Sequence, residues 1–299
     1  MPVLVLGTVA LDTIKTPYGL RKRILGGSAS HFSMSARLFN KVSIVACIGE
    51  DFPQEHINFL KAKGIDLSAL SVEKGKTFYW EGEYRKDFNT AVTLKTELGV
   101  LASFKPRLIP SQRKIKDIFL ANVDPDIQLS LLRNIDSPGF VALDSMNYWI
   151  DSKRKPLLRL FKKVDIFLAN DKEALTLSGE RGVIKAAKSL RKMGLKMVLI
   201  KKGEHGSLFY NGKSFFSLPA YPSDKIIDPT GAGDTFAGGF MGHLSVAKRI
   251  TDKEIRRAIA LGTVAASFNI EGFGLEASSG MCRRALNKRL GSLKKQISF

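Results

Sequence analysis

The fold is decided by one stretch of the chain, Asp228-Pro229-Thr230-Gly231-Ala232-Gly233-Asp234-Thr235-Phe236-Ala237-Gly238-Gly239-Phe240. Its first half is unsuited to a helix interior, because Pro229 lacks an N–H and Gly231 and Gly233 let the backbone turn sharply. After Asp234, apolar side chains recur at helical spacing, namely Phe236, Phe240, Met241 and Leu244. The glycines therefore lie at a helix N-terminus, where unpaired N–H groups and the helix dipole can bind an anion such as a phosphoryl group.

Asp234 stands beside this predicted anion site. A carboxylate would repel a phosphate, so the pattern favours a general base that faces an attacking hydroxyl and takes its proton. The alternative is that Asp234 only caps the helix and that the glycines only turn the chain.

The stretch resembles, position for position, the C-terminal signature of the ribokinase-like family, the PfkB carbohydrate kinases. The resemblance implies that the backbone of Gly231, Ala232 and Gly233 forms an anion hole and that Asp234 is the catalytic base. It also implies a phosphotransferase that depends on ATP and Mg²⁺ and phosphorylates a hydroxymethyl group of a small sugar.

Composition agrees with one large domain over residues 1–299. The chain is 44% hydrophobic, and its two cysteines, Cys47 and Cys282, lie far apart, which suits a reducing compartment such as the cytoplasm. The histidines lack the spacing of zinc ligands. Neither a signal peptide nor an apolar run of membrane-spanning length is visible, so we expect no membrane association.

The formal net charge of +19 raises the question of nucleic-acid binding. The basic residues are spread along the chain in short clusters, which is typical of solvated faces, so nucleic acid is not the expected partner. A positive field would also attract ATP.

Short apolar runs alternate with helical patterns through most of the chain. The runs are residues 3–6, 43–48, 117–121, 140–143, 165–168 and 197–200. This rhythm predicts an α/β fold with a central, mostly parallel sheet covered on both faces, whose ligands gather at the carboxyl ends of the strands. The resemblance implies the three-layer α/β/α fold of the ribokinases with a small β-sheet lid, built here from segments approximately 10–25 and 75–97.

Asn170 and Glu173 follow the run at 165–168 and open a helical pattern. Three residues apart, they point the same way, and their oxygens suit a hydrated Mg²⁺. Helix capping explains the pair equally well. The pair is similar to the Asn-x-x-Glu motif of the family, which implies a role in binding the metal and the ATP phosphates.

The run at 197–200 leads into Lys202-Gly203-Glu204-His205-Gly206. It is similar to the Gly-x-x-Gly loop on the ATP side of the family's site, which implies that Lys202, Gly203 and Gly206 contact the nucleotide. Where the family often has threonine, two residues before the first glycine, this chain has Lys201, which could act as a point charge. A plain hairpin turn is the alternative.

For the phosphate acceptor, the candidates are Asp12, Gly26, Gly27, Ser28 and Asn147. A carboxylate can accept hydrogen bonds from two hydroxyls, and glycines allow a ligand to lie close to the chain. Asp12 and the paired glycines resemble the sugar-binding residues of the family.

Two departures from the ribokinase pattern make ribose less secure as the substrate: Ala10 and His31 replace the asparagines of ribokinases. A nucleoside is the alternative acceptor, because Gly26-Gly27-Ser28 also resembles the adenosine kinase version of this segment. Aromatic residues between Phe78 and Trp80 could then stack on a base.

Two further expectations rest on the resemblance. A monovalent cation such as K⁺ could be held by the loops that carry Asp228, Thr230 and Gly274, and a homodimer could form through the lid. Outside the enzymes, the rival hypothesis is a kinase-like binding protein without catalysis, against which the intact Asp234 argues. Neither a Walker-type phosphate loop nor a complete dinucleotide fingerprint occurs in the sequence.

Overall fold

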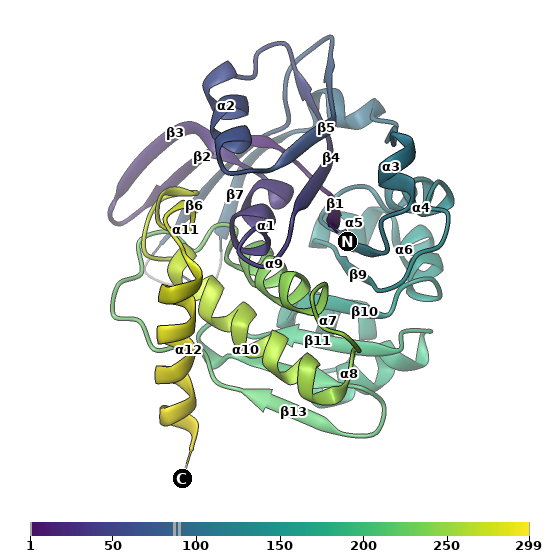
Figure 1. Cartoon of the computed structure of the whole chain (residues 1–299), viewed down its shortest axis with the longest axis vertical. Helices are drawn as coiled ribbons and strands as arrows, with labels where there is room; N and C mark the ends of the chain where they lie inside the picture. Colours follow the sequence, from purple (N-terminus) through teal and green to yellow (C-terminus); the bar gives the residue numbers. More distant parts are fainter. Residues whose placement is uncertain (1, 86–87, 89–90, 299) are drawn as a thin grey trace.

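The computed structural model describes residues 2–85, 88 and 91–298 (Figure 1). Within these residues it contains a nine-stranded sheet with the strand order β13-β12-β11-β10-β9-β8-β1-β4-β5. The strands are β1 (Val3–Leu6), β4 (Val42–Gly49), β5 (Asp66–Glu73), β8 (Asp117–Leu120), β9 (Val141–Asp144), β10 (Ile166–Asn170), β11 (Met197–Lys201), β12 (Ser207–Tyr210) and β13 (Phe215–Leu218). Only the β11–β12 and β12–β13 pairs are antiparallel, which confirms the predicted mostly parallel sheet.

Helices cover both faces of this sheet, so its strands are apolar on both sides. In β1, Val3 and Val5 belong to one core, and Leu4 and Leu6 belong to the other. The first core is closed by α1 (Ser28–Ala36), α2 (Gln54–Ala62), α9 (Ala232–Leu244), α10 (Asp252–Asn269) and α12 (Arg283–Ile297). The second is closed by η1 (Gly99–Ser103), α4 (Pro125–Arg133), α5 (Asn147–Ser152), α6 (Arg154–Phe161), α7 (Asp171–Ser178) and α8 (Val183–Lys192).

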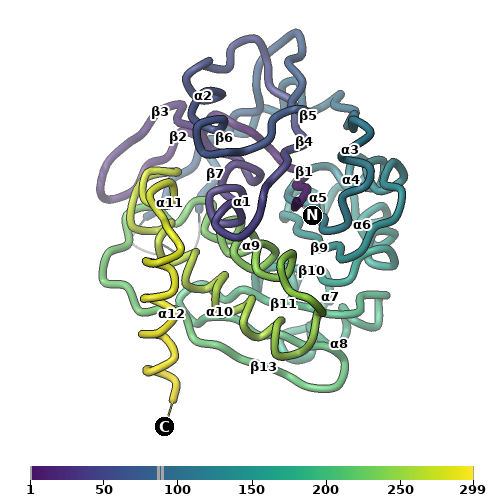
Figure 2. Tube along the Cα trace, viewed as in Figure 1, coloured from purple at the N-terminus to yellow at the C-terminus, as the bar shows by residue number. Residues whose placement is uncertain are grey.

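Three shorter helices lie in connections, namely α3 (Pro110–Arg113), η2 (Gly203–His205) and α11 (Glu276–Ser279). Figure 2 traces the chain from β1 in the interior of the sheet to α12, whose free end carries the C-terminus. The fold is therefore the predicted three-layer α/β/α arrangement.

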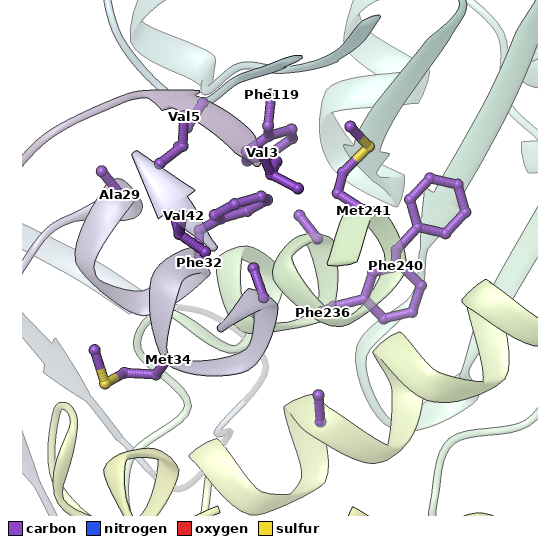
Figure 3. Packing of buried hydrophobic residues seen from close by; sticks show 14 of the residues in the cluster. Val3, Val5, Ala29, Phe32, Met34, Val42, Phe119, Phe236, Phe240 and Met241 are labelled. Carbon is purple, nitrogen blue, oxygen red and sulfur yellow. The ribbon is translucent and has the colours of Figure 1, made fainter. Parts of the chain in front are cut away.

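The pair of helices α1 and α9 forms the centre of the first core (Figure 3). Phe32 of α1 stacks on Phe119 of β8, with 4.7 Å between ring centroids. The helices approach closely because residue 238 is glycine: a Cβ there would lie 2.1 Å from the carbonyl oxygen of Phe32. Ser35 also donates a hydrogen bond to the carbonyl oxygen of Thr235 across 2.6 Å. The N-terminal turn of α9 is thereby held rigidly against α1.

A separate four-stranded sheet has the order β3-β2-β6-β7. Its strands are β2 (Ala10–Thr16), β3 (Gly19–Gly26), β6 (Tyr79–Tyr84) and β7 (Ala91–Glu97). They come from the two segments predicted to form a small sheet, although residues 86–87 and 89–90 of the second segment lie outside the described residues. The small sheet is confirmed, and its closure as a lid stays a prediction. In the described part of the chain, no helix is long and apolar enough to cross a membrane.

Candidate active site

A cavity of about 500 Å³ opens at the carboxyl ends of four neighbouring parallel strands. Thr8, Asn122, Met146 and Glu173 line it, and they follow β1, β8, β9 and β10 respectively. This is the edge where an open α/β sheet binds its ligands. Part of its lining, which we call the polar end, consists of Asp12, Gly27, Ser28, His31, Thr230, Gly231 and Asp234. Another part, which we call the aromatic end, consists of Phe78, Trp80, Tyr148 and Trp149.

The N-terminus of α9 lies at the polar end, as the sequence predicted. Gly231 caps the helix in the left-handed conformation with φ of 72°, which glycine adopts at no steric cost. A Cβ at this position would also lie 2.2 Å from the imidazole ring of His31. The helix begins at Ala232, and Asp234 lies in its first turn. In this turn the Ala232 N–H donates to the Pro229 carbonyl oxygen at 3.1 Å, and Gly231 and Asp234 line the cavity.

Asp234 exposes part of its surface, and that surface lines the cavity. Its carboxyl group has no hydrogen-bond partner among the described residues. The pKa of Asp234 is raised to about 7, mainly by removal from bulk water and in part by the charge of Asp144, while Lys201 opposes the shift. A carboxylate with a pKa near neutrality is suited to accept a proton at physiological pH.

Asp12 is buried at the same end of the cavity. Burial raises its pKa to about 7, the hydrogen bond from the Gly27 N–H lowers it, and the charges of Asp228 and Asp234 raise it. That hydrogen bond is 3.3 Å long. Gly26 lies directly against Asp12, because a Cβ there would be 1.9 Å from a carboxylate oxygen. The predicted Asp12 and paired glycines therefore form one unit.

The predicted Ser28 and Asn147 also line the cavity. The Ser28 hydroxyl accepts a hydrogen bond from the Thr8 N–H at 3.0 Å and lies 3.2 Å from the Thr8 hydroxyl. It therefore fastens α1 to the loop after β1. Asn147 is the first residue of α5.

His31, noted in the sequence only as a departure, is a buried member of the cavity wall. The Asn269 amide nitrogen donates to the Thr230 carbonyl oxygen at 2.7 Å, which turns its amide oxygen toward His31 Nδ1 at 3.0 Å. Nδ1 therefore carries the proton. Burial lowers the pKa of His31 to about 4, so the ring is neutral and Nε2 is a bare acceptor. Nε2 is buried without a partner within the described chain.

Asn170 and Glu173 form a capping box at the start of α7. Each side chain accepts a hydrogen bond from the backbone N–H of the other residue, both at 2.8 Å. Burial raises the pKa of Glu173 to about 8, with Asp144 and Asp234 adding to the shift and Lys201 opposing it. The capping alternative is thus present, and Glu173 lines the cavity as well.

Capping leaves few side-chain oxygens of Asn170 and Glu173 free to bind Mg²⁺. One Glu173 oxygen remains after capping, whereas the Asn170 amide oxygen is committed. The described residues contain no group of three or more His, Cys, Asp or Glu side chains that could hold a metal ion. These residues therefore fit a hydrated Mg²⁺ carried by phosphates, which needs only one or two carboxylates.

Sequence reasoning missed a buried ion pair behind Asp234. Lys201 Nζ donates to Asp144 Oδ2 at 2.7 Å, and the two side chains are 17% and 6% exposed. Burial lowers the pKa of Lys201, but the charges of Asp144, Glu173 and Asp234 outweigh it and leave the pKa raised. The sequence shows both residues at strand ends, but only the parallel sheet brings them together.

Other predicted residues lie outside the cavity lining. Lys202, Gly203 and Gly206 form the turn between β11 and β12, closed by a hydrogen bond from the Lys202 N–H to the Gly206 carbonyl oxygen. The segment is therefore a hairpin turn, and its contact with the nucleotide stays a prediction. Asp228 is fully buried and accepts hydrogen bonds from the N–H groups of Thr230 at 2.9 Å and Gly274 at 2.8 Å, so the predicted cation-site residues lie together.

The fold and the site define a phosphotransferase of the ribokinase type. A family model described as "pfkB family carbohydrate kinase" matches residues 114–280. The chain is 35% identical to the cytidine kinase of Thermococcus kodakarensis over 81% of this chain and 87% of that protein. It therefore belongs to the PfkB family of carbohydrate kinases.

Solved structures share the fold. The nucleoside kinase of Methanocaldococcus jannaschii superposes with a TM-score of 0.79 at 20% identity, over 97% of this chain and 98% of that one. A candidate ribokinase II of E. coli in complex with ATP and Mg²⁺ superposes with a TM-score of 0.78 at 18% identity, over 98% and 99% of the two chains. At these identities the likeness concerns the fold.

Proposed function

We propose that this kinase transfers the γ-phosphoryl group of ATP to the primary hydroxyl of a ribosyl group, and that its acceptor is a nucleoside. The observation that carries the proposal is the lining of the cavity, which combines Asp234 and other polar residues with four aromatic side chains, Phe78, Trp80, Tyr148 and Trp149. Its volume of about 500 Å³ suits a two-ring ligand within the usual range of ligand pockets. A free pentose would leave the aromatic wall without a partner.

In the proposed reaction, the acceptor oxygen bonds to the γ-phosphorus as the bond to the bridging oxygen of ADP breaks. Asp234 accepts the proton of the hydroxyl. The N–H groups of Gly231, Ala232 and Gly233 stabilise the charge on the transferring group, each such donor contributing on the order of 3 kcal/mol. For this, the Ala232 N–H has to leave its hydrogen bond to the Pro229 carbonyl oxygen. The raised pKa of Asp234 supports its role, because a stronger base removes the hydroxyl proton more readily.

For ATP, we assign the phosphates to Asn170 and the nucleotide to the loop with Lys202, Gly203 and Gly206. Glu173 would hold a hydrated Mg²⁺, which neutralises phosphate charge when bound. The E. coli relative with ATP and Mg²⁺ supports this donor. We further assign K⁺ to the Asp228, Thr230 and Gly274 loops, whose buried carboxylate supplies hard oxygen ligands.

For the acceptor, we assign the sugar hydroxyls to Asp12 and to the bare Nε2 of His31, with Gly26, Gly27, Ser28 and Asn147 around them. Nε2 needs a donor, which a sugar hydroxyl supplies. The base would lie against Trp80 and its aromatic neighbours. The likeness to a cytidine kinase makes a pyrimidine nucleoside the first choice.

Two finer assignments complete the proposal. The edge strand β7 exposes Val92 and Leu94. We assign these side chains to the interface of a homodimer that forms through the small sheet, where they would be buried. Size-exclusion chromatography with light scattering tests this. The unpaired Cys47 and Cys282 support a reducing, cytoplasmic compartment.

The decisive experiment follows ADP formation from Mg·ATP across nucleosides, pentoses, hexoses and sugar phosphates. We expect cytidine to exceed ribose in kcat/KM by more than about tenfold, since the base adds binding energy. Equal values would favour the small-sugar alternative. If no acceptor raises turnover above background, the kinase-like binding protein becomes the better hypothesis.

A further inference from the structure

Lys201 lies at the edge of the large sheet that is formed by the carboxyl ends of the parallel strands. It is the last residue of β11, and its partner Asp144 is the last residue of β9. Between them lies β10, whose last residue, Asn170, pairs in register with Lys201. The ammonium group thus bridges two strand ends across a third, at the edge where ligands bind.

The ammonium group also lies against the N-terminal turn of α9. A Cβ on residue 233 would lie 3.0 Å from Lys201 Nζ. Gly233 is one of the residues whose backbone N–H groups are proposed to bind the phosphoryl group. A cation at this distance from the turn is in reach of the same anion.

The hydrogen bonding of Lys201 is incomplete. An ammonium group has three N–H donors, and Asp144 is its one hydrogen-bond partner in the described part of the chain. The side chain is only 17% exposed, so water satisfies the remaining donors poorly. An incoming phosphoryl oxygen would satisfy one of them.

The carboxyl groups around Lys201 favour a positive charge at this position. Asp144, Glu173 and Asp234 each act electrostatically on Lys201, so three carboxyl groups surround one ammonium. A phosphoryl group entering next to them meets repulsion that a fixed positive charge offsets.

We propose that Lys201 is a catalytic residue whose ammonium group contacts an oxygen of the γ-phosphoryl group during transfer. The inference rests on the proposed function for its substrate. Lys201 keeps its proton throughout, while the hydroxyl proton passes to Asp234 and the bond to ADP breaks. The competing explanation is a purely structural ion pair that fastens β9 to β11.

The first test is binding of nucleotide without any acceptor. Calorimetry should give an affinity of the Lys201→Met variant for Mg·ATP at least about tenfold below wild type, with the affinity for Mg·ADP changed less than about twofold. The matched control is Lys196→Met. Lys196 precedes the same strand and pairs with Asp165 at 2.7 Å, but is 71% exposed. Equal loss of both nucleotides, or no loss, overturns the proposal.

The second test is turnover with the best acceptor. In Lys201→Met we expect kcat to fall about 10²–10³-fold, the size of effect seen when one charge-stabilising donor is lost. In Lys201→Ala, methylammonium or ethylammonium should restore part of the rate. Lys196→Met should stay within about twofold of wild type.

The double variant Lys201→Met/Asp144→Asn separates catalysis from folding. Removing both partners relieves an unpaired buried charge, so its melting temperature should recover while its kcat stays as low as that of Lys201→Met. A double variant that recovers kcat shows a structural pair and overturns the proposal. Absence of turnover in wild type would count against the proposed function alone, because the nucleotide affinities still decide the role of Lys201.

Discussion

The polar and the aromatic ends of the cavity are supported in different ways. Asp234 and His31 lie on α9 and α1, whose contact is buried, glycine-rich and tied by the hydrogen bond from Ser35. Trp80 lies on the four-stranded sheet, whose outer strand β7 is exposed along nearly its whole length. The rigid end can hold reacting atoms in place, whereas the peripheral end can change with little effect on the core. The proposed catalytic base thus lies on the buried helix pair, whereas Trp80 lies on the more exposed small sheet.

The sharpest way to test this division is Asp234→Asn. We expect kcat to fall about 10³-fold, since a general base contributes about 10²–10⁴-fold, while the KM for the nucleoside stays within a few-fold. Steady-state kinetics with Mg·ATP measure both constants. The control is Asp126→Asn, an aspartate that is 49% exposed in the first turn of α4. Unchanged turnover in Asp234→Asn would contradict the assignment of Asp234 as the general base.

The rigidity of the polar end depends on the core beneath it. Phe240→Ala removes a fully buried ring of α9 and should lower the free energy of unfolding by about 3–5 kcal/mol. Phe215→Ala, at a ring that is 36% exposed, should cost about 1 kcal/mol. Urea denaturation followed by circular dichroism gives both values. Equal costs would show that the α1–α9 core is not the stabilising centre.

The aromatic end is probed by Trp80→Ala. Loss of a stacking partner worth about 1–3 kcal/mol should raise the KM for the nucleoside about tenfold to a hundredfold and leave kcat within about threefold. The neighbour Tyr79 is not among the residues that line the cavity, and its hydroxyl donates to Glu81 at 2.9 Å, so Tyr79→Phe is the control. A fall in kcat without a change in KM would assign Trp80 to the chemistry.

The smallest expected effect is on pH dependence. Burial raises the pKa values of Asp234 and Asp12 to about 7. Only the ionised form of Asp234 can accept the hydroxyl proton, so kcat/KM should fall about tenfold or more per unit as the pH drops below 7 and level off above it. Initial rates between pH 5.5 and 9, in buffers of about 0.1 M ionic strength, give the profile. A profile flat down to pH 5.5 would contradict the raised pKa values.

Local sequence patterns predicted most strands of the large sheet. The apolar runs mark β1, β4, β8, β9, β10 and β11 to within about two residues, because a buried parallel strand is a short apolar run. Pro229 and Gly231 likewise predicted the turn into α9.

What the sequence could not supply were contacts between distant segments. The pairing of Lys201 with Asp144 depends on the order of strands in the sheet, which no local pattern contains. The role of His31 depends on Asn269, which lies on α10 and sets its tautomer. The sequence indicated that aromatic residues between Phe78 and Trp80 could stack on a base, but not that Phe78 and Trp80 line the cavity while Tyr79 does not.

The active site can form only after most of the chain has been synthesised. α1 leaves the ribosome early, yet its partner α9 and the supporting Asn269 are synthesised last, and Asp228 is anchored only when Gly274 arrives. The apolar surfaces of α1 and β1 therefore stay exposed, or are covered by chaperones, until the final third of the polypeptide has been synthesised. A ribosome that stalls before this point would release a product that is unable to phosphorylate and prone to aggregation.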